Sequence, residues 1–312
     1  MKRIPTTDLK PGMFTARPVR TAAGQIILDE GCLLSAQTIL HIRDYSIPEV
    51  WIRDSSDSSG GLHDYLQKQY APVRSRSERI RQSEEYKIFS QKFDSCTTML
   101  HTALNDCILR AKKLETDKLL AGTLDLFASH TTTLSMFDML HNLRQIDDST
   151  YAHSVNVAII SRMLGNWLGF SEDAQNTLTL CGLLHDIGKT RISKDILYKK
   201  EPLSVDEFSI IKKHPTAGYA ILKNAYKDEE ICQMVLKHHE KITGKGYPYG
   251  TSEKTVQEEI ITVADMFCAM TEPRVYHEGR NLYEVYGFMC QSHELKPEIL
   301  QVLADSILFE GF

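Results

Sequence analysis

The feature that most constrains the fold of this chain is a set of seven metal-compatible side chains between residues 153 and 265. Imidazole and carboxylate groups together suit borderline to hard divalent metals, and an aspartate can bridge two ions. A bridged pair of metals is a recurring device for cleaving phosphate esters. The pattern predicts a metal-dependent phosphohydrolase built as a helical bundle whose ligands project inward from several helices. The seven residues are His153, His185, Asp186, His214, His238, His239 and Asp265.

Composition excludes several other classes. The 312 residues, 42% of them hydrophobic, allow two or three modest domains with real cores. A net charge of -5 does not favour binding to a nucleic acid polymer or to a membrane surface. The N-terminus lacks the apolar core of a signal peptide, and no stretch is long and apolar enough to span a membrane. Seven cysteines without a CxxC pair indicate reduced thiols, so we expect a cytoplasmic protein.

The chain divides into four segments, and the predicted fold class is mainly α. Residues 1–53 alternate short apolar runs with Gly-containing turns, which predicts a small β-rich domain. Residues 54–61 form a flexible linker by their Asp, Ser and Gly content. Residues 62–145 read as a helical connecting region whose apolar stripe is core or the seam of a homodimer. Residues 146–312 form the helical bundle that carries the metal-compatible side chains.

Local patterns predict individual elements within these segments. In the first segment we expect strands over residues 13–19, 25–28 and 49–52, and a helix over 35–45. In the last segment, apolar residues at helical spacing predict a further set of helices. These helices cover residues 177–184, 205–213, 229–239, 258–271, 282–292 and 297–309.

The His185-Asp186 pair follows two leucines that anchor a helix in the core, so both side chains emerge there together. We expect Gly188 to let the backbone leave the helix. Lys189 then lies three positions after Asp186 on the same side, where a cation stabilises developing negative charge. A lone His-Asp dipeptide is usually a solvated turn pair. Here the neighbouring motifs favour the metal-binding interpretation over that one.

His238 and His239 end an apolar helix and precede a Gly-rich turn over residues 244–248. Adjacent imidazoles on one helix point about 100° apart, so both reach a metal centre only at a helix end. The turn is then a loop beside the metals, and its Tyr247 is placed to touch a substrate; the alternative is a plain turn with a packing tyrosine.

Two further residues have structural alternatives. His214 precedes Pro215 and is expected to close a helix, where it is either a metal ligand or a capping or surface histidine. Asp265 is embedded in an apolar helix, and a buried carboxylate needs a cation. That cation is either a metal or the guanidinium of Arg274.

Taken in order, these motifs resemble the HD-GYP family, the HD-superfamily phosphohydrolases that act on cyclic di-GMP. The resemblance covers about residues 147–280, and residues 1–53 look like a small domain often found ahead of such domains. The matching motifs are 147–157, LLHDIGK at 183–189, Ile196-Leu197 with Lys199, Lys213-His214-Pro215, Gly218, HHE at 238–240, GKGYP at 244–248, VAD at 263–265, Arg274 and Tyr276.

The resemblance implies roles for particular residues. All seven metal-compatible side chains fall on the family's ligand positions, with Asp186 as the bridge. Lys189 would assist at the scissile phosphate, while Tyr247 and Arg274 would contact the substrate. Ser149 stands where some members carry a glutamate for a third metal, so we expect two metals, iron or manganese. A bridging water would attack phosphorus and yield pGpG or GMP.

The chain departs from the family pattern at several places without losing a ligand. Thr243 stands where Asp is usual, Cys268 also replaces an Asp, Glu259 replaces an Arg, and His277 occupies a usually basic position. The loop before Asp265 is also about two residues shorter than usual. These departures leave open two alternatives: a low-activity or inactive domain that binds cyclic di-GMP and signals, or a hydrolase of another cyclic dinucleotide.

Overall fold

A computed structural model describes most of the chain as two compact units, Met1–Val73 and Arg74–Phe312. Each unit is described by itself. The described residues are 1–20, 26–35, 38–39, 42–43, 47–53, 80–128, 136, 139–140, 142–143, 150–199, 201–271 and 282–305. The predicted linker at 54–61 lies outside them.

The first unit contains two small antiparallel sheets. β1 (Lys2–Pro5) pairs with β4 (Glu49–Ile52), and β2 (Val19–Arg20) pairs with β3 (Ile26–Leu28). A 3-10 turn, η1 (Thr6–Asp8), follows β1. The unit has its own core. Its fully or nearly fully buried apolar side chains are Leu9, Val19, Leu34, Ile39, Ile42, Ile47, Val50 and Ile52.

The predicted strand over residues 13–19 is wrong in its extent. Phe14 and Thr15 form only isolated bridges, to Leu33 and Ile52, and the strand proper begins at Val19. The Thr15 hydroxyl donates to the carbonyl of Asp29 and accepts from the amide of Cys32, so this residue closes a turn instead of extending a ladder. Of the predicted helix at 35–45, residues 38, 39, 42 and 43 are helical, and the other positions from 36 to 45 lie outside the described residues.

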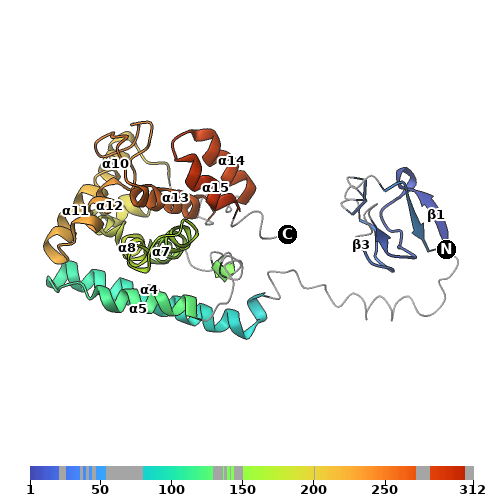
Figure 1. Cartoon of the computed structure of the whole chain (residues 1–312), viewed down its shortest axis with the longest axis horizontal. Helices are drawn as coiled ribbons and strands as arrows, with labels where there is room; N and C mark the ends of the chain where they lie inside the picture. Colours follow the sequence, from blue (N-terminus) through green and yellow to red (C-terminus); the bar gives the residue numbers. More distant parts are fainter. Residues whose placement is uncertain are drawn as a thin grey trace. The chain divides into compact units, whose positions relative to one another are not determined.

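The second unit is layered around two central helices. α7 (Thr150–Trp167) packs against α8 (Glu172–Leu184), and every residue from 152 to 165 is buried, as expected for a core helix. α4 (Glu84–Arg110) and α5 (Thr116–Ala128) lie side by side on one side of this pair, and α13 (Val256–Thr271) lies on the other (Figure 1). The predominance of helix confirms the predicted fold class.

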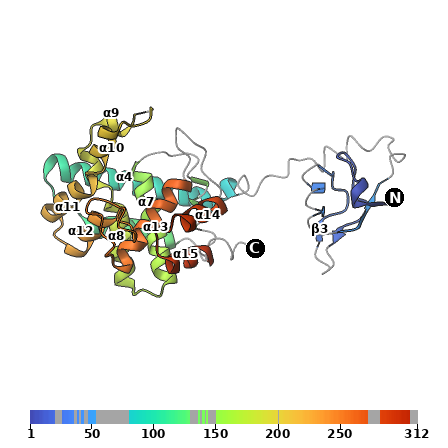
Figure 2. The ribbon, with the colours of Figure 1, turned by 90° about the horizontal axis from the view of Figure 1, so that it is seen from above.

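Short helices complete the second unit. These elements are η3 (Ile187–Arg191), α9 (Lys194–Leu197), α10 (Val205–Ile211), α11 (His214–Ala225), α12 (Glu229–Lys237), α14 (Leu282–Ser292) and α15 (Pro297–Ala304). α11 and α12 pack together at one end of α13, while α14 and α15 pack against its other part (Figure 2).

Sequence-encoded caps fix where several helices begin. The hydroxyl of Ser171 accepts the Ala174 amide at the start of α8, and Ser204 forms a reciprocal capping box with Glu207 at the start of α10. Asp228 accepts the Ile231 amide at the start of α12. These caps set the positions of the helices that carry the histidines.

The cysteines and the lengths of the apolar helices can be compared with the predictions from sequence. All seven cysteines are free thiols, in agreement with the expected absence of a disulfide framework. Within the described residues, no helix is both long enough and apolar enough to cross a membrane.

Gly182 on α8 allows the close contact with α7 on which the core depends. A Cβ at this position would lie 2.4 Å from the Cα of Ala158 and 2.6 Å from its backbone nitrogen. Neither backbone atom can move without shifting α7.

We therefore expect Gly182→Ala to lower the free energy of unfolding by about 1–3 kcal/mol or more, because it overpacks a rigid contact. Urea denaturation followed by circular dichroism measures this change. Gly287→Ala on α14 is the matched control, since a Cβ there meets no atom within 4 Å and alanine favours helix by about 1 kcal/mol. Equal stability of the two variants would contradict the expected clash.

Candidate metal centre

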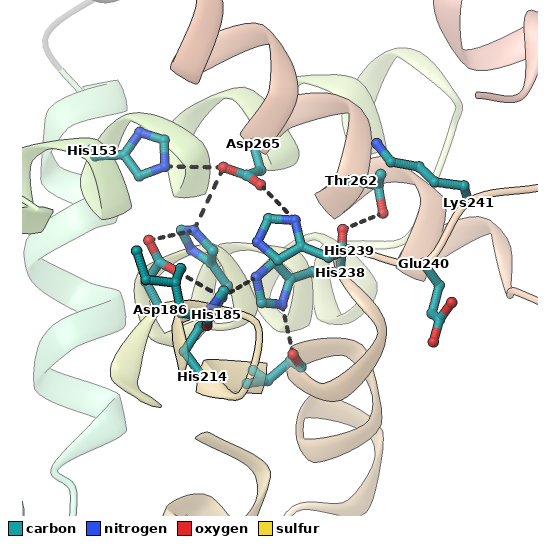
Figure 3. A network of polar contacts seen from close by, with 12 residues as sticks. His153, His185, Asp186, His214, His238, His239, Glu240, Lys241, Thr262 and Asp265 are labelled. Atoms are coloured by element: carbon teal, nitrogen blue, oxygen red, sulfur yellow. Dashed lines mark hydrogen bonds and ion pairs between the residues drawn. The ribbon is translucent and has the colours of Figure 1, made fainter. Parts of the chain in front are cut away.

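The seven metal-compatible side chains converge on one buried point from five segments of the second unit (Figure 3). His153 lies in the first turn of α7 and Asp265 in the middle of α13. His185 and Asp186 follow α8, His214 begins α11, and His238 and His239 follow α12. The chain therefore brings together groups that are far apart in sequence, six of them at the ends or in the first turns of helices and Asp265 from the middle of α13.

The turn after α8 presents His185 and Asp186 to this point. Leu183 and Leu184 are buried, as the sequence predicts, and α8 ends at Leu184. The expected role of Gly188 is wrong. A Cβ there would lie 1.9 Å from the carbonyl oxygen of His214, so glycine is needed because η3 and α11 touch through their backbones.

His214 lies at the opposite end of a helix from the one predicted. It begins α11 instead of closing the preceding helix, which ends at Ile211. Pro215 occupies the first turn, where the missing N–H of proline removes no helical hydrogen bond. Proline next to a histidine is compatible with either end of a helix, and packing against η3 selects the start.

Three histidines are oriented by the same kind of hydrogen bond to a backbone carbonyl. The Nδ1 atoms of His185, His214 and His238 lie 2.8, 2.8 and 2.6 Å from the carbonyl oxygens three residues earlier, those of Gly182, Ile211 and Val235. A carbonyl only accepts hydrogen bonds, so each Nδ1 carries a proton, and in the neutral rings of His214 and His238 the Nε2 carries a lone pair. Such support of a ring nitrogen is typical of metal-ligating histidines.

The lone pairs and carboxylates face each other. The Nε2 atoms of His214 and His238 are 3.1 Å apart, and each points its lone pair toward the other. Asp186 lies 3.3 Å from both His185 and His214 through its two oxygens. This arrangement is repulsive without a cation between the nitrogens.

Asp265 lies close to three of the histidines. Its Oδ1 lies 3.0 Å from the Nε2 of His153 and 3.9 Å from that of His185, and its Oδ2 lies 3.6 Å from the Nδ1 of His239 (Figure 3). The predicted alternative partner of Asp265, Arg274, lies outside the described residues.

The surroundings of the histidines and aspartates favour the protonation states in which these groups can bind a metal ion. Burial lowers the pKa of His214, His238 and His239, the last to about 3, so these rings are neutral. Burial alone would raise the pKa of Asp186, but His185 and Lys189 outweigh it and hold the carboxyl well below its usual range. Burial would likewise raise the pKa of Asp265, but its hydrogen bond with His153 contributes to holding this carboxyl well below its usual range.

The donor set fits divalent metal ions. Three groups of side chains each bring their ligand atoms within 4.8 Å of one another. Among the described residues, His185 Nε2 and Asp186 Oδ1 are buried atoms without a hydrogen bond, which is costly unless an ion occupies the space between them. The three groups are His214-His238-His239, His153-His185-Asp265 and His185-Asp186-His238.

Two groups at the rim are suited to bind an anionic substrate. The ammonium of Lys189 lies 2.6 Å from Asp186 Oδ2, on the side predicted from sequence. The ring of Tyr247 lies over His239, with centroids 4.7 Å apart, and the ammonium of Lys212 lies 5.6 Å from the tyrosine centroid. Lys212 was not predicted from the sequence, because a surface lysine before His214 carries no distinguishing signal.

The loop that carries Tyr247 is folded onto the two histidines. A Cβ on Gly246 would lie 2.4 Å from the carbonyl oxygen of His239, so only glycine permits this approach. The Tyr247 amide donates to the same carbonyl at 3.2 Å. The buried carboxylate of Glu240 accepts the amides of Tyr249, Gly250 and Thr251. Glu240 belongs to the HHE motif at 238–240, but its residue type and spacing do not predict this role.

Comparison with known proteins supports this picture. Residues 116–294 match the model of the HD domain family, which covers more than half of the chain. A solved structure described as Bd1817, a HDG"Y"P protein from Bdellovibrio bacteriovorus, superposes with a TM-score of 0.51 over 97% of this chain and 98% of its own. At 18% identity, this likeness shows the fold alone.

Three curated relatives are similar in sequence. The 3′3′-cGAMP-specific phosphodiesterase 1 of Vibrio cholerae is 34% identical over 142 residues, which is 45% of this chain and 33% of the relative. The cyclic di-GMP phosphodiesterase PA4108 of Pseudomonas aeruginosa is 28% identical over 98% of this chain and 77% of its own length. A cyclic di-GMP phosphodiesterase of Thermotoga maritima is 34% identical over 49% of this chain and 42% of its own.

The aligned part of this chain thus spans from a third to about three quarters of the length of these relatives. The family match covers the helical unit that holds the histidines, and the motif order agrees with the family resemblance seen in the sequence. The chain belongs to the HD domain family and, within it, to the HD-GYP group.

Proposed function

We propose that this protein is a metal-dependent phosphodiesterase that hydrolyses cyclic di-GMP to pGpG or GMP. The observation that carries the proposal is the pair of facing Nε2 lone pairs of His214 and His238 beside two carboxylates. Two divalent ions, iron or manganese, suit a donor set of imidazoles and carboxylates without cysteine. The residues that would hold them are His153, His185, Asp186, His214, His238, His239 and Asp265, and Asp186, whose two oxygens face His185 and His214, is the expected bridge.

Each rim residue has a distinct task in this proposal. When bound, two divalent ions acidify a water molecule and offset charge on a phosphate ester. Lys189 places a positive charge at the rim, where it neutralises a phosphate oxygen. Tyr247 offers an aromatic face for a guanine base, and Lys212 adds a cation above it. Arg274, the third predicted substrate contact, lies outside the described residues.

The identity of the cyclic dinucleotide is the open part of the proposal. Relatives of this chain are named for cyclic di-GMP and for 3′3′-cGAMP. Thr243, a departure from the family pattern, is exposed at the start of the substrate loop, while Cys268 is buried on α13. A mixed GMP-AMP ring is therefore the second candidate substrate, and binding without turnover is the remaining alternative.

Cellular location and assembly complete the proposal. Seven free thiols, five of them buried, suit a reducing compartment, and we place the protein in the cytoplasm. The homodimer predicted through residues 62–145 stays a prediction.

The first test is product chromatography with Mn- or Fe-loaded protein prepared without oxygen. We expect pGpG or GMP from cyclic di-GMP, and a loss of at least about 100-fold in kcat for Asp186→Asn, because removing one charge-stabilising group typically costs 10²–10³. Asp195→Asn is the matched control, since this aspartate is exposed on α9. Full activity of Asp186→Asn would exclude the proposed centre.

A competition assay decides the substrate. Equal concentrations of cyclic di-GMP, 3′3′-cGAMP and cyclic di-AMP are incubated with the metal-loaded protein, and each loss is followed by chromatography. We expect cyclic di-GMP to disappear first, because most relatives found are named for it. Preferential hydrolysis of 3′3′-cGAMP would identify the mixed GMP-AMP ring as the substrate in place of cyclic di-GMP. Tight binding without hydrolysis of any of the three cyclic dinucleotides would favour a signalling domain.

The neutral buried histidines predict the pH dependence of the metal-free protein. Folded His214, His238 and His239 have lowered pKa values, so the unfolded chain binds more protons below its usual value of 6.5. The free energy of unfolding should therefore fall as the pH drops from 6.5 toward 4, by up to about 1.4 kcal/mol per pH unit for each ring.

Urea denaturation in chelator at pH 7.5, 6.0 and 5.0 measures this effect. A His238→Gln/His239→Gln variant should show a shallower slope, because two of the three titrating rings are gone. A free energy of unfolding that rises on acidification would show that these rings are not neutral in the folded protein.

A further inference from the structure

A fully buried ion pair between Lys254 and Glu259 lies beside the turn that follows the two adjacent histidines. The Nζ of Lys254 is 2.9 Å from the Oε2 of Glu259, and neither side chain is exposed to solvent. Burying two opposite charges costs several kcal/mol of hydration for each ion, which their attraction repays only with good geometry and further polar contacts. The contacts of this pair therefore indicate what it is for.

Lys254 is surrounded by three oxygen atoms. Besides Glu259, its ammonium donates to the carbonyl oxygen of Glu240 at 3.0 Å and to the hydroxyl of Thr262. The contacts with Glu240 and Thr262 are hydrogen bonds, and the contact with Glu259 Oε2 is an ion pair without hydrogen-bond geometry. Glu259 and Thr262 lie on α13 and Glu240 follows the two histidines, so Lys254 joins these two segments.

Two of these contacts lead to the histidines. Glu240 follows His239 in the chain, so its carbonyl fixes the backbone after the second histidine. The hydroxyl of Thr262 lies 2.8 Å from the carbonyl oxygen of His238, to which it donates (Figure 3). Thr262 lies on α13, one turn before Asp265. Lys254 thus ties the His238-His239 turn to the helix that supplies the carboxylate.

Glu240 and Glu259 each hold a further backbone segment in place. The carboxylate of Glu240 collects three successive amides of the loop, from Tyr249 to Thr251. The second oxygen of Glu259 accepts the Lys296 amide at the start of α15. The ion pair therefore connects the loop, α12, α13 and α15.

We propose that Lys254 and Glu259 are a positioning pair that sets the His238-His239 turn and the Tyr247 loop against Asp265. This inference deepens the proposed function and rests on it. Neither residue touches the metal ligands' side chains in the described structure; both act through the backbone and Thr262.

The test is a double variant, Lys254→Met/Glu259→Gln. It removes both buried charges together, and the glutamine oxygen still accepts the Lys296 amide. Replacing both members of a buried pair by uncharged residues is often neutral for stability, whereas removing one leaves an unpaired charge. Thermal unfolding and Mn²⁺ binding, followed by electron paramagnetic resonance of the free ion, are measured on the full chain.

We expect the double variant to unfold near the wild-type temperature but to bind one of its two Mn²⁺ ions about 10- to 100-fold more weakly, as for other residues that orient ligands. The weakened site is the His214-His238-His239 group. In cyclic di-GMP hydrolysis, KM should rise through the displaced Tyr247 loop at saturating metal. A purely structural pair would lower the unfolding temperature and leave Mn²⁺ affinity unchanged, which would overturn the proposal.

Lys237→Met/Glu258→Gln is the matched control. This pair also joins α12 to α13, at 3.1 Å, but Lys237 is partly exposed and neither side chain contacts the histidine carbonyls. We expect its Mn²⁺ affinity to change by no more than about twofold, since such partly exposed pairs contribute little. An equal loss of affinity in both double variants would overturn the specific role of Lys254 and Glu259.

Thr262→Val decides the matter if the first double variant does not fold. It removes only the hydroxyl between Lys254 and the His238 carbonyl and keeps the side-chain volume. Weaker binding of one Mn²⁺ supports the proposal, and wild-type affinity for both ions overturns it. Because metal affinity is read separately from hydrolysis, a wild-type protein that binds two ions but cleaves no cyclic dinucleotide removes the proposed function alone.

Discussion

The constraint on which the rest of the structure depends is the burial of several imidazoles and two carboxylates around one point. His185, His214 and His238 are almost fully buried, and the two aspartates beside them stay ionised. Burying such polar groups is costly, and the facing lone pairs of His214 and His238 repel each other without a cation. Rigid helices fixed elsewhere must therefore hold these groups in place.

The surrounding fold meets this requirement through backbone contacts. Gly182 lets α8 approach α7, Gly188 lets η3 approach α11, and Gly246 lets the loop that carries Tyr247 approach the histidine turn. Backbone carbonyls then orient three rings by their Nδ1 atoms. Contacts made by backbone atoms are stiffer than contacts between long side chains, so the fold itself fixes where these side chains lie.

The sequence predicted the helical class, the seven side chains that come together and the side on which Lys189 lies, because each depends on local residue type and spacing. It failed at Gly188 and His214 for a common reason. Both residues take their role from the contact between η3 and α11, and neither a glycine nor a His-Pro dipeptide shows which segment packs against it. The strand at 13–19 failed because the Thr15 hydroxyl bonds to a turn.

By itself, the sequence determined which chemical groups are available: five imidazoles, two carboxylates and a lysine. Only the tertiary structure decided which atoms face one another. His153 and Asp265 meet at 3.0 Å although 112 positions separate them, and Lys254 lies against three oxygens from two segments. Residue type is local information, whereas distance and ring orientation arise from packing between segments remote in the chain.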